Sequence, residues 1–233
     1  MGLPIQKAPT YNCELPLTGL KIKFRPFLVK EQNHLLIIKE SQGEAEIFNA
    51  ITEMIKAVTN GEIDASKLPM ADLEYLFINI RARSVGESIE VPYICRHQGC
   101  GHVHRSTLDL LSLDVDDVDV EEQIQISDNL IVEMRPPIAK DAIKWSGLDE
   151  SELIKPLIRT CMVRLYDDEE IYDMNDHRDS EIDEFVESLS LEQFDKISNF
   201  FASLPQLQHN EKWTCENCGG ENDVVLKGLQ NFF

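Results

Sequence analysis

The 233-residue sequence lacks any long uninterrupted apolar run, and it is poor in positive charge. No apolar run approaches the roughly 18 residues that a membrane-spanning helix needs, so we expect no membrane partner. Only 22 Lys and Arg stand against 42 Asp and Glu, which gives a net charge of −20. Because nucleic-acid affinity depends largely on cations that meet phosphates, we expect no direct binding of nucleic acid.

The short motifs that mark common enzyme sites are also missing. The sequence has no Walker phosphate-binding loop, no Gly-x-Ser-x-Gly, no His-Glu-x-x-His and no dinucleotide-binding fingerprint. Residues 167–184 hold ten carboxylates, but Arg178 stands where a calcium-binding loop requires glycine. We therefore interpret 167–184 as a solvated loop and predict a protein that is not an enzyme.

The remaining composition is that of a globular protein. Hydrophobic residues make up 42% of the chain and charged residues 27%, and the length suits one or two domains. The charge is uneven, because residues 1–39 carry six Lys and Arg against two Glu. A basic head on an acidic body can orient binding to another protein, although solvated faces are the simpler interpretation.

Four of the six cysteines form two pairs, Cys95-x4-Cys100 and Cys215-x2-Cys218. The first residues lack the apolar stretch of a signal peptide, so we expect a cytosolic protein with reduced thiols. In such a compartment, paired cysteines favour a metal site over disulfides.

Two thiol-bearing turns from distant positions can complete one structural zinc site, as in zinc ribbons. Glycines after Cys100 and Cys218 allow both turns to close. We predict one zinc per chain held by Cys95, Cys100, Cys215 and Cys218, with no open position for catalysis. Two alternatives remain open. One replaces a cysteine with a histidine, and the other has no metal. The candidate histidines are His97, His102 and His104.

Apolar periodicity and turn residues predict a mixture of hairpins and helices. Hairpins are expected over 11–24 and 122–134, and strand-turn-strand units around each cysteine pair. Helices are expected over 47–58, 66–83, 138–146, 149–165 and from Ser190 to Pro205, with Leu35 to Ile38 helical as well. Asp149 with Glu152 and Ser190 with Gln193 fit capping boxes.

The second half of the chain repeats the plan of the first. Arg25-Pro26 and Arg135-Pro136 each follow a hairpin, 110 residues apart, and Cys100 and Cys218 are 118 residues apart. We predict a helix-rich α+β fold of two pseudo-repeated halves, each with a hairpin, helices and a Cys-bearing β-knuckle, joined by a zinc-ribbon-like site. The expected units are 1–110, an acidic connector over 111–122, and 123–233.

Three segments carry a resemblance to a known family. They are Leu-Pro-Leu-Thr-Gly-Leu-Lys-Ile-Lys-Phe-Arg-Pro-Phe-Leu-Val-Lys-Glu over 15–31, Arg-Ala-Arg-Ser-Val-Gly-Glu over 81–87, and Gly-Leu-Gln-Asn-Phe-Phe over 228–233. The sequence resembles the baseplate hub family of T4-like contractile-tailed bacteriophages. The resemblance implies a phage tail protein without enzymatic activity, which acts in the host cytoplasm and helps to assemble the central hub of the baseplate.

This resemblance implies other baseplate hub proteins as partners. The candidate contacts are Arg25, Phe27, Phe232 and Phe233, although a groove of the protein itself is the favoured place for the two terminal phenylalanines. One alternative is a structural hub subunit that stays in the virion baseplate. A second alternative is an acidic zinc-ribbon regulator of nucleic-acid machinery.

Overall fold

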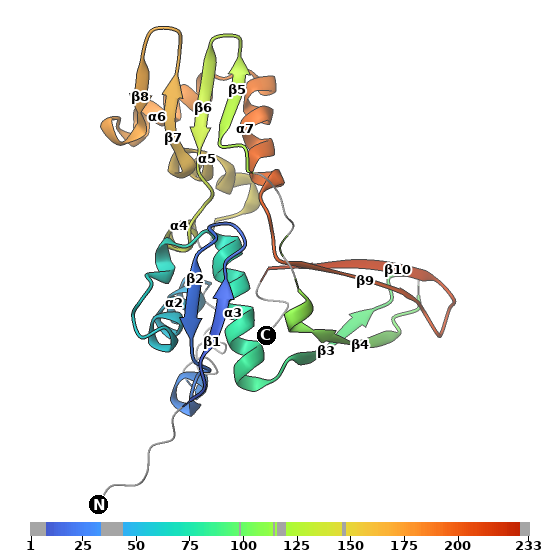
Figure 1. Cartoon of the computed structure of the whole chain (residues 1–233). Helices are drawn as coiled ribbons and strands as arrows, with labels where there is room; N and C mark the ends of the chain where they lie inside the picture. The colour runs from blue at the N-terminus through green and yellow to red at the C-terminus, as the bar shows by residue number, and fades with distance from the viewer. Residues whose placement is uncertain are drawn as a thin grey trace, which may run out of the picture.

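The computed structural model of the chain describes residues 8–33, 44–97, 99–113, 115, 120–145 and 148–228. These residues form two lobes and an arm that projects away from them (Figure 1). The expected α+β class is confirmed, because helices and antiparallel sheets both make up large parts of the structure.

The first lobe is built from a hairpin and helices of the N-terminal half. Its elements are β1 (Tyr11–Glu14), β2 (Lys21–Phe24), α2 (Glu44–Val58), η1 (Ala65–Lys67) and α3 (Met70–Val85). Gly19, at a φ of +66°, allows the tight turn between β1 and β2. The fully buried Asp72 accepts hydrogen bonds from the backbone N–H groups of Leu17 and Thr18, at 2.8 and 3.0 Å. The hairpin turn is thereby fixed to the start of α3.

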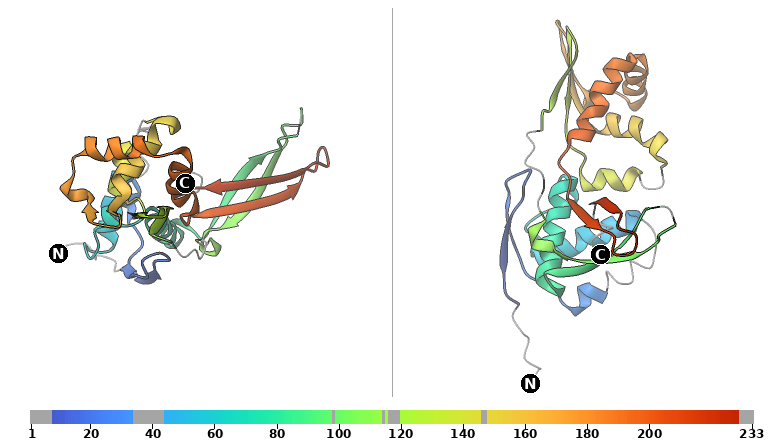
Figure 2. Two further views of the ribbon diagram at one scale, coloured as in Figure 1. Left: turned by 90° about the horizontal axis from the view of Figure 1, so that it is seen from above. Right: turned by 90° about the vertical axis from the view of Figure 1, so that its right-hand side faces the viewer.

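The second lobe is a four-stranded antiparallel sheet with helices on one face (Figure 2). The sheet order is β5-β6-β7-β8, and the strands are β5 (Gln123–Ser127), β6 (Leu130–Met134), β7 (Met162–Tyr166) and β8 (Ile171–Asp173). The helices are α5 (Glu150–Cys161), η3 (Met174–Asp176), α6 (Asp179–Ser188) and α7 (Leu191–Ser203). The short helix α4 (Ala139–Trp145) connects the lobes.

Two long hairpins form the arm. They are β3 (Ser88–Ile94) with β4 (Val103–Asp109), followed by η2 (Leu110–Ser112), and β9 (Gln208–Thr214) with β10 (Glu221–Lys227). Each hairpin is a separate two-stranded sheet, and Figure 2 shows the two running side by side away from the helices. The arm therefore combines a segment from the middle of the chain with one from near its end.

The buried apolar residues fall into two clusters. One fills the first lobe, and it includes Leu207 and Trp213 from the C-terminal part of the chain. The other lies between the sheet and helices of the second lobe. After forming the second lobe, the chain thus returns to the first lobe, where residues of its last part join the core.

Several predicted elements are confirmed. Hairpins form at both predicted positions, and α2 buries its apolar stripe until Asn60 and Gly61, both at positive φ, end the helix. The side chain of Ser190 caps α7, and the Gln193 side chain reaches back to the N–H of Ser190, as expected of a capping box.

Three expectations within the second half are wrong. Residues 162–165 are not helical, because β7 pairs there with β6 and this pairing ends α5 at Cys161. The acidic stretch 167–184 is not a simple loop, since it contains β8, η3 and the start of α6. Asp149 occupies the N-cap of α5, but its side chain makes no capping hydrogen bond.

Some expectations fall on residues outside the described ranges. The predicted helix over Leu35 to Ile38 is one of them, as are residues 114 and 116–119 of the acidic connector predicted over 111–122. Val115, which is described, forms an isolated antiparallel bridge with Leu207. In the described part of the chain, no helix is both long and apolar enough to cross a membrane.

Candidate metal centre

The four paired cysteines meet at the tips of the two arm hairpins. The Sγ atoms of Cys95 and Cys218 lie 3.7 Å apart, as do those of Cys100 and Cys215, and all four lie within 4.8 Å of one another. A tetrahedral zinc ion with Zn–S bonds of about 2.3 Å holds its sulfurs roughly 3.8 Å apart. The prediction that the two distant thiol turns converge is confirmed, and the spacing suits one metal ion.

Backbone hydrogen bonds shape both turns into similar knuckles. The N–H of Cys95 donates to the carbonyl of His102, and the N–H of Cys215 donates to that of Gly220, both at 2.8 Å. Gly101 and Gly219 take positive φ values of +60° and +70° directly after the second cysteine of each pair. The longer Cys95–Cys100 loop therefore closes as the shorter one does.

The two knuckles press against each other at Gly220. A Cβ atom added there would lie 2.3 Å from Cδ2 of His97, too close for any side chain larger than hydrogen. The Nε2 atom of His97 in turn lies 2.8 Å from the carbonyl oxygen of Glu221. The absence of a side chain at Gly220 is thus what allows the imidazole of one knuckle to cross the other.

Two asparagines of the second hairpin donate hydrogen bonds to sulfurs of the first. Nδ2 of Asn217 lies 3.3 Å from Sγ of Cys100, and Nδ2 of Asn222 lies 3.6 Å from Sγ of Cys95. The buried Asn222 also accepts from the N–H of Arg96 and donates to the carbonyl of Gly220. Such outer contacts orient metal ligands and offset thiolate charge.

The acidity of the thiols differs within the cluster. A hydrogen bond from Asn217, helped by the backbone of His102, lowers the pKa of Cys100 to about 6. For Cys218, the backbone N–H of Gly220 favours the thiolate, but lost solvation and the neighbouring thiols raise the pKa to about 12. One thiolate therefore forms readily, whereas four thiolates this close require a compensating positive charge.

The histidine alternatives do not take part in this cluster. Within the described residues, the group of potential metal ligands contains only the four cysteines. Nε2 of His97 is at the carbonyl of Glu221, and the His104 ring stacks on Trp213. His102 contributes through its backbone carbonyl to the turn at Cys95.

An aromatic seam joins the hairpins below the knuckles. The ring centroid of Trp213 lies 5.3 Å from that of Tyr93 and 5.1 Å from that of His104, which is nearly parallel to it. The largely buried Glu211 lies beside the seam, with Nε2 of His209 at 3.0 Å. Burial alone would raise the pKa of Glu211, but hydrogen bonds from His209 and Ser106 hold it below its usual range. These ring contacts pack the two hairpins against each other below their tips.

The other two cysteines are unreactive core residues. Burial raises the pKa of Cys13 to about 11 and that of Cys161 to about 12. At neutral pH both therefore remain thiols, packed among apolar side chains of the two cores.

The candidate partner residue Arg25 is engaged within the first lobe. Its guanidinium donates to the carbonyl of Pro26 at 2.9 Å and to Glu31 at 3.0 Å, and its side chain is 18% exposed. Phe27 is half-buried against the first core, and its N–H donates to Ser84. Phe232 and Phe233 lie outside the described residues. A role for these residues in partner contacts stays a prediction.

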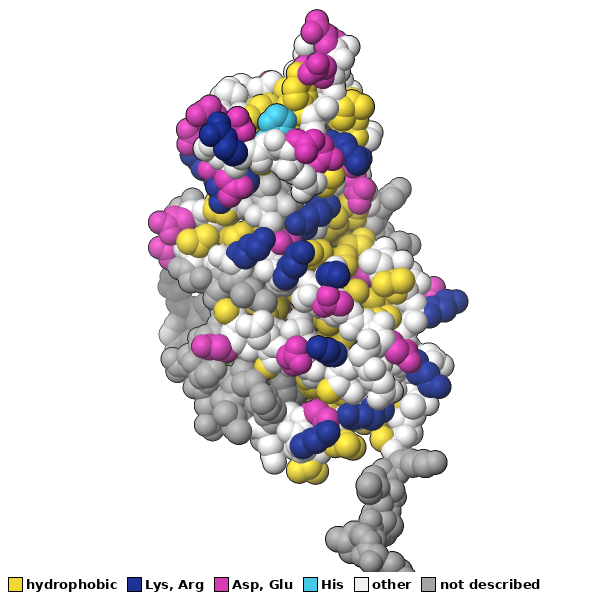
Figure 3. All heavy atoms as spheres, turned by 90° about the vertical axis from the view of Figure 1, so that its left-hand side faces the viewer, with side chains coloured by type: hydrophobic (Ala, Val, Ile, Leu, Met, Phe, Trp, Pro, Cys, Tyr) yellow, Lys and Arg dark blue, Asp and Glu magenta, His cyan; other side chains and the backbone are white. Residues whose placement is uncertain are grey.

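Three of the described cations in the N-terminal segment have a carboxylate nearby. Lys21 lies 3.5 Å from Glu14 and Lys30 lies 3.4 Å from Glu31. On the face in Figure 3, several Lys and Arg side chains gather at mid-height, and elsewhere Lys and Arg lie beside Asp and Glu. The ion pairs of Lys21 and Lys30 agree with the interpretation of solvated faces.

Sequence reasoning missed the residues that donate hydrogen bonds to the sulfurs, and it missed the contact between Arg135 and Asp141. Asn217 was inside the Cys-x2-Cys motif, but nothing in the pattern singled out Asn222 or Trp213. Arg135 was noted only for its position, whereas its guanidinium donates to the buried Asp141 at 2.8 Å.

Comparison with known families assigns the chain to one of them. A family model described as T4 bacteriophage base plate protein matches residues 8–233, which include both lobes and the arm. The chain belongs to this family. No curated protein and no solved structure matches this base plate protein. The predicted kinship with T4-like baseplate proteins is thereby confirmed.

Proposed function

We propose that this base plate protein is a non-enzymatic assembly factor that binds other hub proteins while the central hub of the baseplate is built in the host cytoplasm. The observation that carries the proposal is the arm, which projects from the two lobes (Figure 1). The family of the chain is that of a T4 base plate protein. Near its tip, the paired residues Ile94 and Val103 are 64% and 45% exposed. Exposed apolar pairs on a protruding hairpin suit contact with another protein.

Copurification from infected cells tests this proposal. A tagged chain should capture other hub proteins, and Ile94→Arg should lose them because it places a charge on the contact face. The matched control is Leu191→Arg, at an 83% exposed position on α7 in the second lobe. Capture that survives Ile94→Arg contradicts a role for the arm, and absence of any hub protein contradicts the proposal.

The alternative of a retained structural subunit is separated by the composition of the particle. An assembly factor that leaves is absent from purified virions, whereas a subunit occurs there at a fixed copy number. Quantitative mass spectrometry of purified particles decides between them.

We propose that the four-cysteine centre holds one structural Zn²⁺. Sulfur spacing close to that of a tetrahedral site and two amide donors to the sulfurs support this identity. Four thiolates would leave no open coordination position, so the ion would join the hairpins and supply no chemistry. Elemental analysis of protein purified without chelator should give about one zinc per chain, and Cys215→Ser should abolish it.

We further propose that the chain contains a duplicated unit. The guanidinium of Arg25 donates to the carbonyl of Pro26, to Glu31 six positions on, and to the carbonyl of Ala57 near the end of α2. Arg135 makes the same set of contacts, to Pro136, Asp141 and Thr160. Both units then continue through helices into a cysteine-bearing hairpin. The shared network supports the two pseudo-equivalent halves inferred from sequence.

A further inference from the structure

An apolar pocket of about 190 Å³ lies where the two lobes meet. Its walls come from the hairpin turn of the first lobe, the start of α3, the segment after β6, α5 and the end of α7. The lining residues are Leu17, Pro69, Met70, Ala71, Pro136, Pro137, Leu157, Phe201, Leu204, Pro205 and Gln206. We call this the junction pocket.

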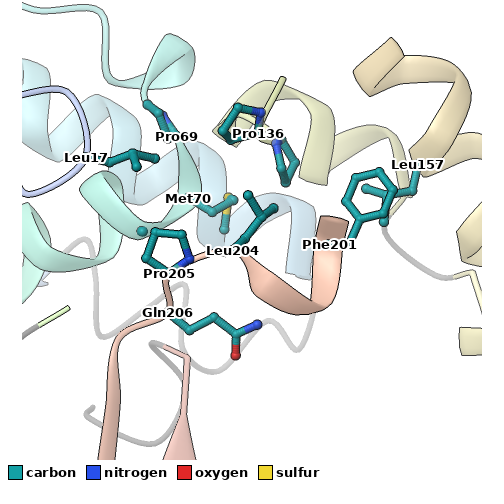
Figure 4. A pocket seen from close by; sticks show the side chains of 11 residues that line it. Leu17, Pro69, Met70, Pro136, Leu157, Phe201, Leu204, Pro205 and Gln206 are labelled. Carbon is teal, nitrogen blue, oxygen red and sulfur yellow. The ribbon is translucent and has the colours of Figure 1, made fainter. Parts of the chain in front are cut away.

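The shape and chemistry of the junction pocket suit one aromatic ring. In Figure 4, Met70, Leu204 and Pro205 face one another, whereas the Gln206 side chain points away from them. All lining residues except Gln206 are apolar. A cavity of about 150 Å³ is enough to take up benzene, so this volume accommodates a phenyl side chain.

The end of the described chain lies within reach of the pocket. The N–H of Gly228 donates to the carbonyl of Leu207 at 3.3 Å, and Leu207 directly follows the lining residues Leu204 to Gln206. Five residues, Leu-Gln-Asn-Phe-Phe, follow Gly228. At most about 3.4 Å per residue, they span roughly 17 Å, whereas the three residues from Leu207 back to Leu204 span roughly 10 Å.

A second contact places the exit of the chain on the pocket side of α3. A Cβ atom added at Gly228 would lie 3.8 Å from Oε1 of Glu74. Glu74 is one helical turn from Met70, and residues four apart lie on the same face of a helix. The chain therefore leaves its last hairpin beside the helix face that carries a wall of the pocket.

We propose that the C-terminal segment 229–233 docks back on its own chain, with one ring of Phe232 or Phe233 in the junction pocket. The occupant contacts both lobes at once, because Met70 belongs to the first and Phe201 and Leu204 to the second. Backbone hydrogen bonds from Met70 to Pro137 and from Ala139 to Leu68 already join the lobes beside the pocket. The docked ring adds apolar side-chain contacts to this junction. The proposal does not depend on the hub function.

Photo-cross-linking of the full chain tests this docking. Benzoylphenylalanine is placed at position 232 or 233, and the purified protein is irradiated at low concentration without any partner. Peptide mass spectrometry should find cross-links within one chain to the start of α3 or the end of α7. Leu17→Trp, which fills the pocket, should abolish these cross-links, whereas the matched Leu17→Ala should retain them.

Each other outcome overturns the proposal. Cross-links between two chains would show that a second copy takes the ring. Cross-links within the chain that avoid the pocket, or that survive Leu17→Trp, would place the tail elsewhere. Cross-links that form only after a hub protein is added, and then to that protein, would make the phenylalanines a hook for a partner.

Discussion

At the scale of single residues, Asn222 connects the two knuckles through three hydrogen bonds. Its side chain is 7% exposed, and it joins the N–H of Arg96, the carbonyl of Gly220 and the sulfur of Cys95. An amide is required there, because only an amide offers both the acceptor and the donors. One buried side chain therefore aligns both thiol turns.

We expect Asn222→Ala to weaken metal binding by about 10–100-fold, the usual loss when an outer contact to a ligand is removed. Asn217→Ala should have a smaller effect, because the exposed Asn217 supports only Cys100. Competition titrations with cobalt, followed by its thiolate absorption, measure both affinities. Unchanged affinity in Asn222→Ala would contradict this role.

The buried Glu31 makes stability depend on pH. Burial would raise its pKa, but hydrogen bonds from Arg25 and the N–H of Leu28 hold it below the ordinary value of 4.5. A depressed carboxyl pKa stabilises the fold above the unfolded value, and this stabilisation is lost as the pH falls through the folded value.

Replacing this carboxylate should therefore remove part of the pH dependence. At pH 7 we expect Glu31→Gln to lower the free energy of unfolding by about 1–3 kcal/mol, since hydrogen bonds to a charged group are lost. The difference should shrink as the pH falls below 4.5 and through the lower folded pKa, because the wild-type carboxyl then takes up a proton. Urea unfolding over a series of pH values from 7 downward measures this, and a difference that stays constant across the series would contradict the assignment.

At the scale of elements, the arm is the part most dependent on its cross-links. Each of its two sheets has only two strands, and an isolated two-stranded hairpin is marginally stable in water. The aromatic seam and the cysteine cluster supply the contacts that a larger sheet would provide.

We expect metal removal to loosen the arm selectively. After chelation under reducing conditions, amide hydrogen exchange should accelerate in β3, β4, β9 and β10, while the β5–β8 sheet keeps its protection. The second lobe serves as the internal control, because its core contains none of the four clustered cysteines. Equal acceleration in both regions would show that the ion supports the whole fold.

The sequence predicted elements well where a local signal had one meaning. Ser190 with Gln193 marked the start of α7, and turn residues marked the hairpins. It failed over 162–165, where apolar spacing continued the helix but pairing with β6 determined the structure. It also failed at α6, whose Ile182 and Val186 are buried four residues apart in a stretch dominated by acidic residues.

The candidate site was predictable in its ligands but not in its support. The spacing of Cys95, Cys100, Cys215 and Cys218 suggested a shared centre, and their sulfurs converge. The roles of Asn222 and Gly220 depend on contacts between hairpins more than 100 positions apart in the chain. Such contacts exist only after both hairpins have packed, so no local pattern carries them.

At the scale of the whole molecule, two matching arginine networks hold the lobes in shape. Arg25 and Arg135 each link a hairpin, an acidic residue six positions on, and the end of a helix. The carboxylate of Asp141 is 1% exposed and that of Glu31 is 9% exposed. Removing either guanidinium would leave its partner carboxylate buried with less positive charge nearby to offset the negative charge.

We expect Arg25→Ala and Arg135→Ala each to lower the free energy of unfolding by about 2–4 kcal/mol, less than for a fully buried pair because both arginine side chains are partly exposed. The effect of Arg135→Ala should be the larger, since Asp141 is more deeply buried. Lys67→Ala, which removes an exposed pair with Asp64, is the control and should change stability by less than about 0.5 kcal/mol. Denaturant unfolding measures all three, and a negligible effect of either arginine would contradict equivalent roles.

The distance along the chain between the two knuckles determines when the arm can be completed during synthesis. Cys100 and Cys215 are 115 positions apart in the chain. At about 5–20 residues per second, the first pair leaves the ribosome on the order of 10 s before the second. A translation product that stops before Cys215 would never close its arm, so a partner that recognises the closed tip would accept only chains that extend through the second hairpin of the arm.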